Sequence, residues 1–130
     1  MTQRDVIVGI DLGTTNSCIA VLIDGELQVI PDEQGYRTQC SVVSFLADGS
    51  LVIGEEARRE MIADPRNTIF SSKRFIGWPY GSRESRRLRT QLPYRVKRND
   101  DEGSVIEVRG EEYSFPEISA LILHLSLIHI

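Results

Sequence analysis

The sequence is poor in several features that mark secreted, membrane-bound and metal-binding proteins. Its two cysteines, Cys18 and Cys40, match no metal-binding or redox spacing, so we expect both to be small buried hydrophobic side chains in a reducing compartment. No apolar run approaches the roughly 20 residues that a membrane-spanning helix needs. The first five residues resemble neither a secretory signal nor a transit peptide. We therefore expect a cytoplasmic chain with no membrane partner.

The sequence also lacks internal repeats, low-complexity linkers and a strong excess of one charge. Its net charge of −4 gives no general attraction to nucleic acid or to anionic membranes. The segment 83–98 is locally basic, with seven basic residues and one acidic residue, but an acidic run at 100–102 follows directly. No aromatic platform is interleaved with these basic residues. We therefore expect segment 83–98 to be solvated surface, and we expect no nucleic-acid partner.

Hydrophobic patterning and turn residues predict a mixture of short strands and helices. The dipeptides Asp24-Gly25 and Asp48-Gly49 are typical of hairpin turns. Strands are predicted over 6–11, 18–23, 27–30, 41–46, 51–53, 93–98, 105–109 and 112–114, with a polar loop at 32–39. Helices are predicted over 55–63, 71–76, 82–90 and from 117 onward, after Pro116. Strands come first and mixed elements follow, which indicates an α+β or mixed α/β fold.

The final segment, "ISALILHLSLIHI" at 118–130, departs from the amphipathic pattern of a surface helix. It is nearly all apolar and has no charged face. A helix that is hydrophobic all round must be buried by something, and the sequence offers no evident partner for it. We therefore expect residues 125–130 to be an artefact or a truncated tail.

The turn that follows the first predicted strand carries an unusual set of small and polar residues. Gly13-Thr14-Thr15-Asn16 offers backbone N–H groups and hydroxyls in a tight bend, which can form a nest for a phosphate. Asp11, just before the turn, would face that phosphate through a cation, and Mg²⁺ suits the role. The alternative is a plain hairpin whose hydroxyls bond to their own backbone. The segment is not a Walker A loop, because it lacks that motif and leads into a strand.

Several stretches of the sequence resemble the seventy-kilodalton heat-shock (DnaK-type) chaperones, over roughly residues 5–123. The strings that carry the resemblance are "GIDLGTTNS" at 9–17, "GYRTQCSVVSF" at 35–45, "LVIG" at 51–54, "PRNTIFSSKRFIG" at 65–77 and "PEIS" at 116–119. The Thr-Thr-Asn form of the first string is similar to the bacterial and organellar branch. Cys40 is a departure, because the family pattern has proline there.

The resemblance implies an ATPase of the actin-like, ribonuclease H-like fold, of which this chain supplies only part of lobe I. Residues 1–39 and 116–124 would begin the base subdomain, which holds the first phosphate loop, and residues 40–115 would form the upper subdomain. By the same resemblance, Asp11 helps to hold hydrated Mg²⁺, and Lys73 points at the γ-phosphate and the attacking water. The residues that line the β- and γ-phosphates are Gly13, Thr14, Thr15 and Asn16. Lys73 is thus the implied catalytic residue, while the role of Arg74 stays open.

The resemblance also implies a function for the parent protein. It would be an ATP-dependent molecular chaperone that uses ATP, ADP and Mg²⁺ to drive cycles of binding and release of unfolded, hydrophobic peptide segments. Its partners would include a J-domain co-chaperone and a nucleotide exchange factor, in the cytoplasm of a bacterial-type cell. Two alternatives are a fragment of another actin-fold enzyme, such as a sugar kinase, and an inert truncated chain. We expect the isolated chain to be inactive, since the second phosphate loop and the adenosine pocket are missing.

Overall fold

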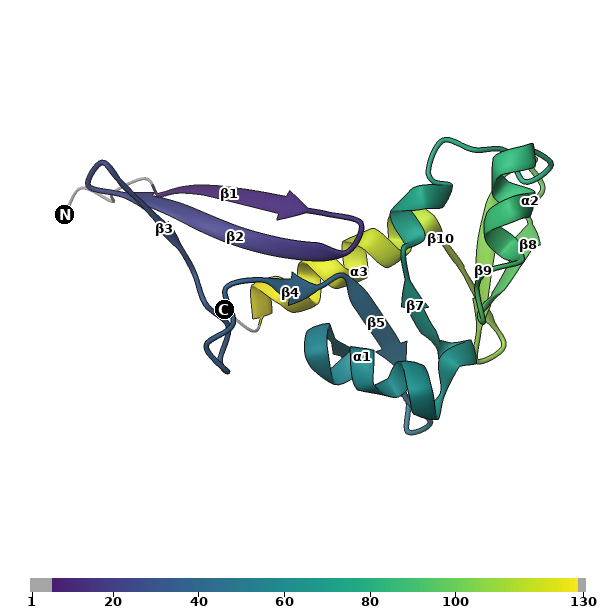
Figure 1. The fold of residues 1–130 in the computed structure, drawn as a ribbon, viewed down its shortest axis with the longest axis horizontal. Helices are drawn as coiled ribbons and strands as arrows, with labels where there is room; N and C mark the ends of the chain where they lie inside the picture. The colour runs from purple at the N-terminus through teal and green to yellow at the C-terminus, as the bar shows by residue number, and fades with distance from the viewer. Residues whose placement is uncertain (1–5, 129–130) are drawn as a thin grey trace.

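The computed structural model describes residues 6–128, which form a mixed α/β structure as predicted. Within this range, ten strands are arranged in three antiparallel sheets. Figure 1 shows the first sheet as a long projection that extends away from the other two. Residues 1–5 and 129–130, which include the start of the predicted base subdomain and the end of the predicted tail, lie outside the described residues.

The first sheet consists of β1 (Ile7–Leu12), β2 (Asn16–Ile23), β3 (Glu26–Val29) and the short β4 (Gln39–Cys40). Strand β2 lies in the middle and pairs with the other three. The predicted turn between β2 and β3 is confirmed. Asp24 and Gly25 have φ values of 51° and 81°, the left-handed conformation that this dipeptide tolerates best. Strand β1 forms a free edge, and Ile7 is 65% exposed.

The second sheet, in the order β6-β5-β7, forms the buried centre of the molecule. Its strands are β5 (Val42–Phe45), β6 (Leu51–Ile53) and β7 (Thr68–Phe70). Helix α1 (Gly54–Ala63) packs against β5, and the 3₁₀ turn η1 (Pro65–Asn67) leads into β7. All four residues of β5 are buried, because they lie between α1 and the helix that ends the described chain. The strand β7 was not predicted from the sequence.

The third sheet joins β8 (Arg95–Arg98), β9 (Ser104–Val108) and β10 (Glu111–Ser114) as a meander. Before it come the 3₁₀ helix η2 (Ser72–Phe75) and helix α2 (Arg83–Arg89). The Ser82 hydroxyl caps α2 by accepting a hydrogen bond from the Ser85 amide at 3.1 Å. These elements confirm the strands and helices predicted for 71–114, with the first helix in 3₁₀ form.

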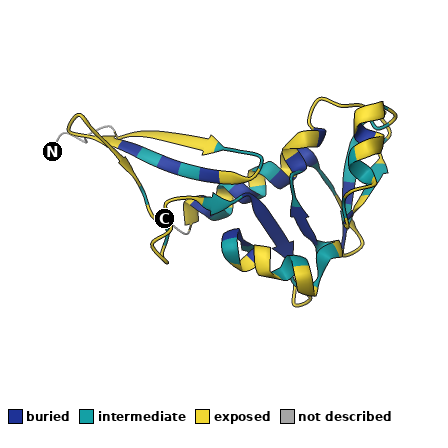
Figure 2. Ribbon diagram, viewed as in Figure 1, coloured by how far each residue is buried: buried dark blue, intermediate teal, exposed yellow. Residues whose placement is uncertain are grey.

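Helix α3 (Phe115–Ile128) is buried along one face, which corrects the expectation that nothing covers it. It contacts η2 and the second and third sheets, and Ile118 and Ile122 are among the core residues. In Figure 2, buried residues alternate with more exposed ones along α3. The last two described residues, Leu127 and Ile128, are exposed. The sequence pattern hid part of this burial because η2, β5 and β6, which contact α3, lie far from it along the chain.

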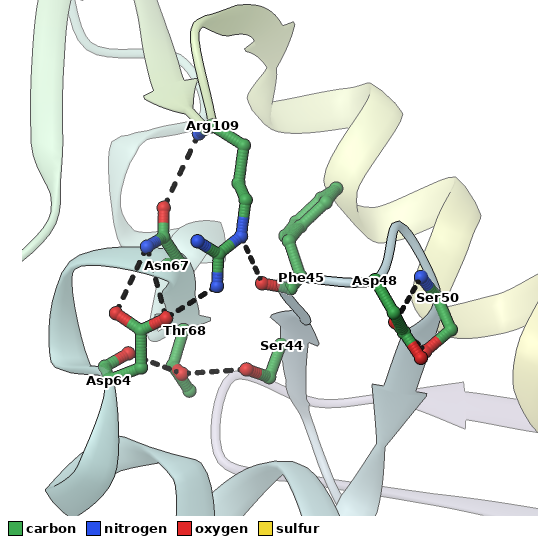
Figure 3. Close-up of polar contacts among 8 residues, drawn as sticks. All are labelled: Ser44, Phe45, Asp48, Ser50, Asp64, Asn67, Thr68 and Arg109. Atoms are coloured by element: carbon green, nitrogen blue, oxygen red, sulfur yellow. Dashed lines mark hydrogen bonds and ion pairs between the residues drawn. The ribbon is translucent and has the colours of Figure 1, made fainter.

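Arg109, in the turn between β9 and β10, ties the third sheet to the second (Figure 3). Its Nε donates to the Phe45 carbonyl oxygen at 2.8 Å, and its guanidinium forms an ion pair of 2.6 Å with Asp64. Asn67 donates to the other carboxylate oxygen of Asp64 at 2.9 Å. One arginine therefore links a strand end, the end of α1 and a distant hairpin.

Candidate functional site

The turn between β1 and β2 is closed tightly by its own backbone. The Gly13 amide donates to the Asn16 carbonyl oxygen at 3.0 Å. A Cβ atom added at Gly13 would lie 2.3 Å from that same oxygen, so the position accepts only glycine without a backbone shift. Thr14 and Thr15 form the tip of the turn. This compact bend is the predicted phosphate loop, defined here as residues 13–16.

Two buried serines, Ser17 and Ser41, support the phosphate loop through hydrogen bonds on its protein side. The Ser41 hydroxyl donates to the Gly13 carbonyl oxygen at 2.7 Å and lies 2.8 Å from the Ser17 hydroxyl. The Ser41 amide donates to the Thr15 carbonyl oxygen at 2.8 Å. The carbonyl groups of Gly13 and Thr15 thus point toward Ser41, and these hydrogen bonds hold the loop in shape. Sequence reasoning missed this role, for which the only signal is a pair of small polar residues beside apolar strands.

Lys73 reaches the phosphate loop from a separate part of the chain. It lies on η2, and its ammonium group donates a hydrogen bond to the Leu12 carbonyl oxygen, 61 residues earlier. The side chain is exposed to solvent, so this cation is accessible at the mouth of the loop. The structure therefore brings Lys73, which the resemblance singled out, to the turn whose residue types predicted a phosphate nest.

The donors at the tip of the loop are free to bind a ligand. The amides and hydroxyls of Thr14 and Thr15 donate no hydrogen bond to any residue within 6–128. Unused backbone and hydroxyl donors on a tight bend, next to a lysine, match the chemistry of a polyphosphate oxygen cluster. The residues present thus fit a nucleotide phosphate.

Asp11 lies on the exposed edge strand β1, two residues before the loop begins. Its carboxylate makes no hydrogen bond or ion pair with any other described residue. Among residues 6–128, no group of three or more His, Cys, Asp or Glu side chains comes together to hold a metal. A single free carboxylate fits Mg²⁺ held mainly by water and phosphate oxygens, which is the mode that Mg²⁺ prefers with nucleotides. Asp11 therefore suits the role that the resemblance implies.

A cavity of about 360 Å³ opens beside the loop and is lined by Thr14, Thr15 and Asn16. Across it lies Arg58 of α1, which pairs with Glu55 at 3.5 Å and which the sequence reasoning did not single out. The volume falls within the roughly 300–1,000 Å³ of ligand pockets. Arg58 adds a second cation to this side of the loop.

The two cysteines are only partly buried, so the expectation of buried hydrophobic side chains is wrong. Cys40 pairs with Asn16 across β4 and β2, and its thiol donates to a Glu55 carboxylate oxygen at 3.4 Å. Burial, followed by the neighbouring Glu55, raises the pKa of the Cys40 thiol. The thiol is therefore protonated and unreactive near neutral pH.

Comparison with known families places the chain in the class of chaperone-type ATPases. A family model described as Hsp70 protein matches residues 7–126, and the chain belongs to the Hsp70 family. This confirms the resemblance read from the sequence. The antiparallel sheets and three α-helices within residues 6–128 are those of part of an actin-like Hsp70 ATPase lobe. No helix in that range combines the length and apolar character needed to cross a membrane.

Proposed function

We infer that this chain is the N-terminal part of an ATP-dependent molecular chaperone and carries one half of its nucleotide site. The observation that carries this inference is the contact between the Lys73 ammonium and the Leu12 carbonyl oxygen, which sets a cation at the mouth of the phosphate loop. Family membership supports the general activity. It also disfavours the sugar-kinase alternative.

In this proposal the phosphate loop binds the β- and γ-phosphates of ATP. The free amides and hydroxyls of Thr14 and Thr15 donate to the phosphate oxygens, and Asp11 accepts from the water shell of Mg²⁺. When bound, Mg²⁺ neutralises charge on the phosphate oxygens. Gly13 and Asn16 hold the loop in shape through their backbone hydrogen bond.

Lys73 would act on the reacting γ-phosphoryl group. Hydrolysis forms a bond from a water oxygen to the γ-phosphorus and breaks the bond to the oxygen that bridges the β- and γ-phosphates, which leaves with ADP. The attacking water gives up a proton to the solvent in the overall reaction. Negative charge spreads over the phosphoryl oxygens during this exchange. The Lys73 ammonium, released from the Leu12 carbonyl, would offset that charge, and such electrostatic stabilisation is a large part of phosphoryl-transfer catalysis.

The exposed first sheet supports the proposal that further parts of the lobe pack here. One face of strand β1 carries only apolar residues, Val8, Ile10 and Leu12, a pattern typical of a strand face that packs against a core. Yet Ile7, Val8 and Ile10 are each more than 40% exposed. We propose that residues 6–39 and 116–124 belong to the base subdomain of lobe I and residues 40–115 to its upper subdomain.

The longer protein would then follow the cycle implied by its family. ATP binding and hydrolysis would alternate weak and tight binding of unfolded, hydrophobic peptide segments. A J-domain co-chaperone and a nucleotide exchange factor would control the steps. We propose a cytoplasmic location for this protein.

A comparison of two purified chains tests the proposal that the site is divided. The first is the 130-residue chain, and the second joins residues 1–124 to the remainder of an Hsp70 ATPase domain. We expect no ATP hydrolysis above background from the first and magnesium-dependent hydrolysis from the second. Turnover by the 130-residue chain that depends on Lys73 would overturn the half-site proposal. Absence of nucleotide binding by the joined chain would overturn the proposed function itself.

A further inference from the structure

A second groove lies away from the phosphate loop, between η2 and the third sheet. One wall is formed by residues 75–79, which lead toward α2 across the top of the molecule in Figure 1. The other wall is the turn between β8 and β9, and the start of α3 closes one end. The groove has a volume of about 490 Å³, within the roughly 300–1,000 Å³ of ligand pockets. We call it the Trp78 groove.

The walls of the Trp78 groove are fixed by hydrogen bonds. The Tyr80 amide donates to the Glu102 carbonyl oxygen at 2.9 Å, which ties the two walls together. In the β8–β9 turn, the Asn99 side-chain oxygen accepts from the amides of Asp101 and Gly103, at 2.9 and 2.7 Å. The groove is therefore formed before any partner binds, which lowers the entropic cost of binding.

Its base is firm and apolar. Phe75 and Phe115 stack with their ring centroids 4.5 Å apart, and both are buried in the core. Above them, Ile76 and Trp78 are each 45% exposed. A large aromatic side chain left exposed in a groove is typical of an anchoring site at an interface.

The charge of the groove narrows the kind of partner that it fits. The charged residues that line it are both acidic, Asp101 and Glu102. Glu102 pairs with Arg98 at 3.8 Å, with both side chains well exposed, while Asp101 forms no ion pair within residues 6–128. An apolar floor with an acidic rim complements a segment that presents a large apolar side chain between basic ones.

We propose that the Trp78 groove binds a short segment of a partner protein in which leucine or a similar apolar residue is flanked by lysine or arginine. The apolar side chain contacts Ile76 and Trp78, and the basic groups lie against Asp101 and Glu102. This site is separate from the phosphate loop and does not depend on nucleotide. The tests of this peptide-binding proposal are therefore independent of the tests of the proposed ATPase function.

The fluorescence of Trp78 tests this proposal directly, since it is the chain's single tryptophan. The probe is the peptide Lys-Arg-Leu-Leu-Arg-Lys, compared with Glu-Asp-Leu-Leu-Asp-Glu and Lys-Arg-Ser-Ser-Arg-Lys. The first peptide should shift the emission of the full chain to shorter wavelength in a saturable way, and the other two should not. An equal response to the acidic or the polar peptide would overturn the proposal, as would no response to the first. A shift that grows with protein concentration alone would also overturn it, because a second copy would then cover the groove.

A pair of variants separates charge recognition from a general effect of net charge. Asp101→Asn with Glu102→Gln should weaken binding of a fluorescein-labelled form of the basic peptide about tenfold at low salt. The matched control, Glu33→Gln with Glu56→Gln, removes two exposed carboxylates elsewhere and should bind the peptide like the original chain. Equal weakening in both double variants would contradict recognition by the groove. Binding is measured by the fluorescence anisotropy of the labelled peptide. Trp78→Ala should abolish this binding while the far-UV circular dichroism spectrum of the chain stays unchanged.

Discussion

The ammonium group of Lys73 and the carbonyl oxygen of Leu12 are hydrogen-bonded although 61 residues separate them in the sequence. This contact joins η2 to the strand end that leads into the phosphate loop. It holds an exposed cation beside the loop, where the proposed mechanism needs one to offset charge on a phosphoryl group. The predictions below concern the shape of the loop, the contacts that support it and the role of this lysine.

Gly13→Ala should disrupt the phosphate loop. The new Cβ would lie 2.3 Å from the Asn16 carbonyl oxygen, so the backbone must move at a cost of about 1–3 kcal/mol. Nucleotide affinity of the joined chain, measured by isothermal titration calorimetry, should fall at least tenfold. Gly9→Ala is the matched control, because no atom lies within 4 Å of its added Cβ. Equal losses in the two variants would refute the steric account.

Ser41→Ala should destabilise the chain by removing the hydrogen bonds that support the phosphate loop. It removes the donor to the Gly13 carbonyl oxygen and the partner of the buried Ser17 hydroxyl. Leaving such groups unsatisfied costs about 1–3 kcal/mol. Urea unfolding should show this loss in the 130-residue chain, while Thr38→Ala, at an exposed position, should have little effect. Unchanged stability in Ser41→Ala would show that the serine brace contributes nothing.

Arg109→Lys should destabilise the attachment of the third sheet. Lysine cannot bond to the Phe45 carbonyl and the Asp64 carboxylate with the fixed fork that arginine provides. The ion pair is partly exposed, so we expect a loss of about 1–2 kcal/mol. A double-mutant cycle with Asp64→Asn measures the coupling, and additive effects would contradict a direct link between the two residues.

Tyr94 should make stability fall at alkaline pH. Burial raises the pKa of its phenol well above the ordinary value of 10.0, and its hydroxyl donates to the Phe70 carbonyl oxygen at 2.5 Å. Because the folded pKa is higher than the unfolded one, this contribution is complete below about pH 10 and is lost as the pH rises further.

Tyr94→Phe is the variant that isolates this effect. It should be less stable than the original chain by about 1 kcal/mol at pH 8, because the hydrogen bond to the Phe70 carbonyl is gone. The difference should shrink as urea unfolding is repeated toward pH 11, since phenylalanine does not titrate. A difference that stays constant over this range would contradict the role given to the Tyr94 hydroxyl.

Local sequence signals predicted most of the fold because its turns and helix ends are encoded locally. Asp24-Gly25 and the cap residue Ser82 are examples whose conformations follow from the residue types themselves. Strand β7 was missed because it has three residues, and one of them is the buried, polar Thr68. The Thr68 hydroxyl is satisfied by Ser44, 24 residues away at 2.9 Å, which no local pattern reveals. The burial of α3 was missed because some of the elements that contact it, such as β5 and β6, are likewise distant in the sequence.

The sequence indicated the turn of the candidate site, but not the contacts that support it or bring Lys73 beside it. The turn chemistry of residues 13–16 could be read from the sequence, whereas the role of Lys73 came only from the family resemblance. The braces Ser17 and Ser41 escaped notice because a hydroxyl that supports a loop looks like any other small polar residue. The roles of Asp11 and Lys73 in binding and hydrolysis stay predictions.

Single-turnover ATP hydrolysis by the joined chain tests the central claim most directly, when the original sequence is compared with Lys73→Ala. We predict that the variant hydrolyses ATP at least a hundredfold more slowly, while its affinity for ADP changes by less than about threefold, because in the proposed mechanism Lys73 acts on the γ-phosphoryl group alone. Arg74→Ala, which removes the exposed neighbouring cation, controls for loss of charge and should retain turnover. Undiminished hydrolysis by Lys73→Ala would contradict the account of the site.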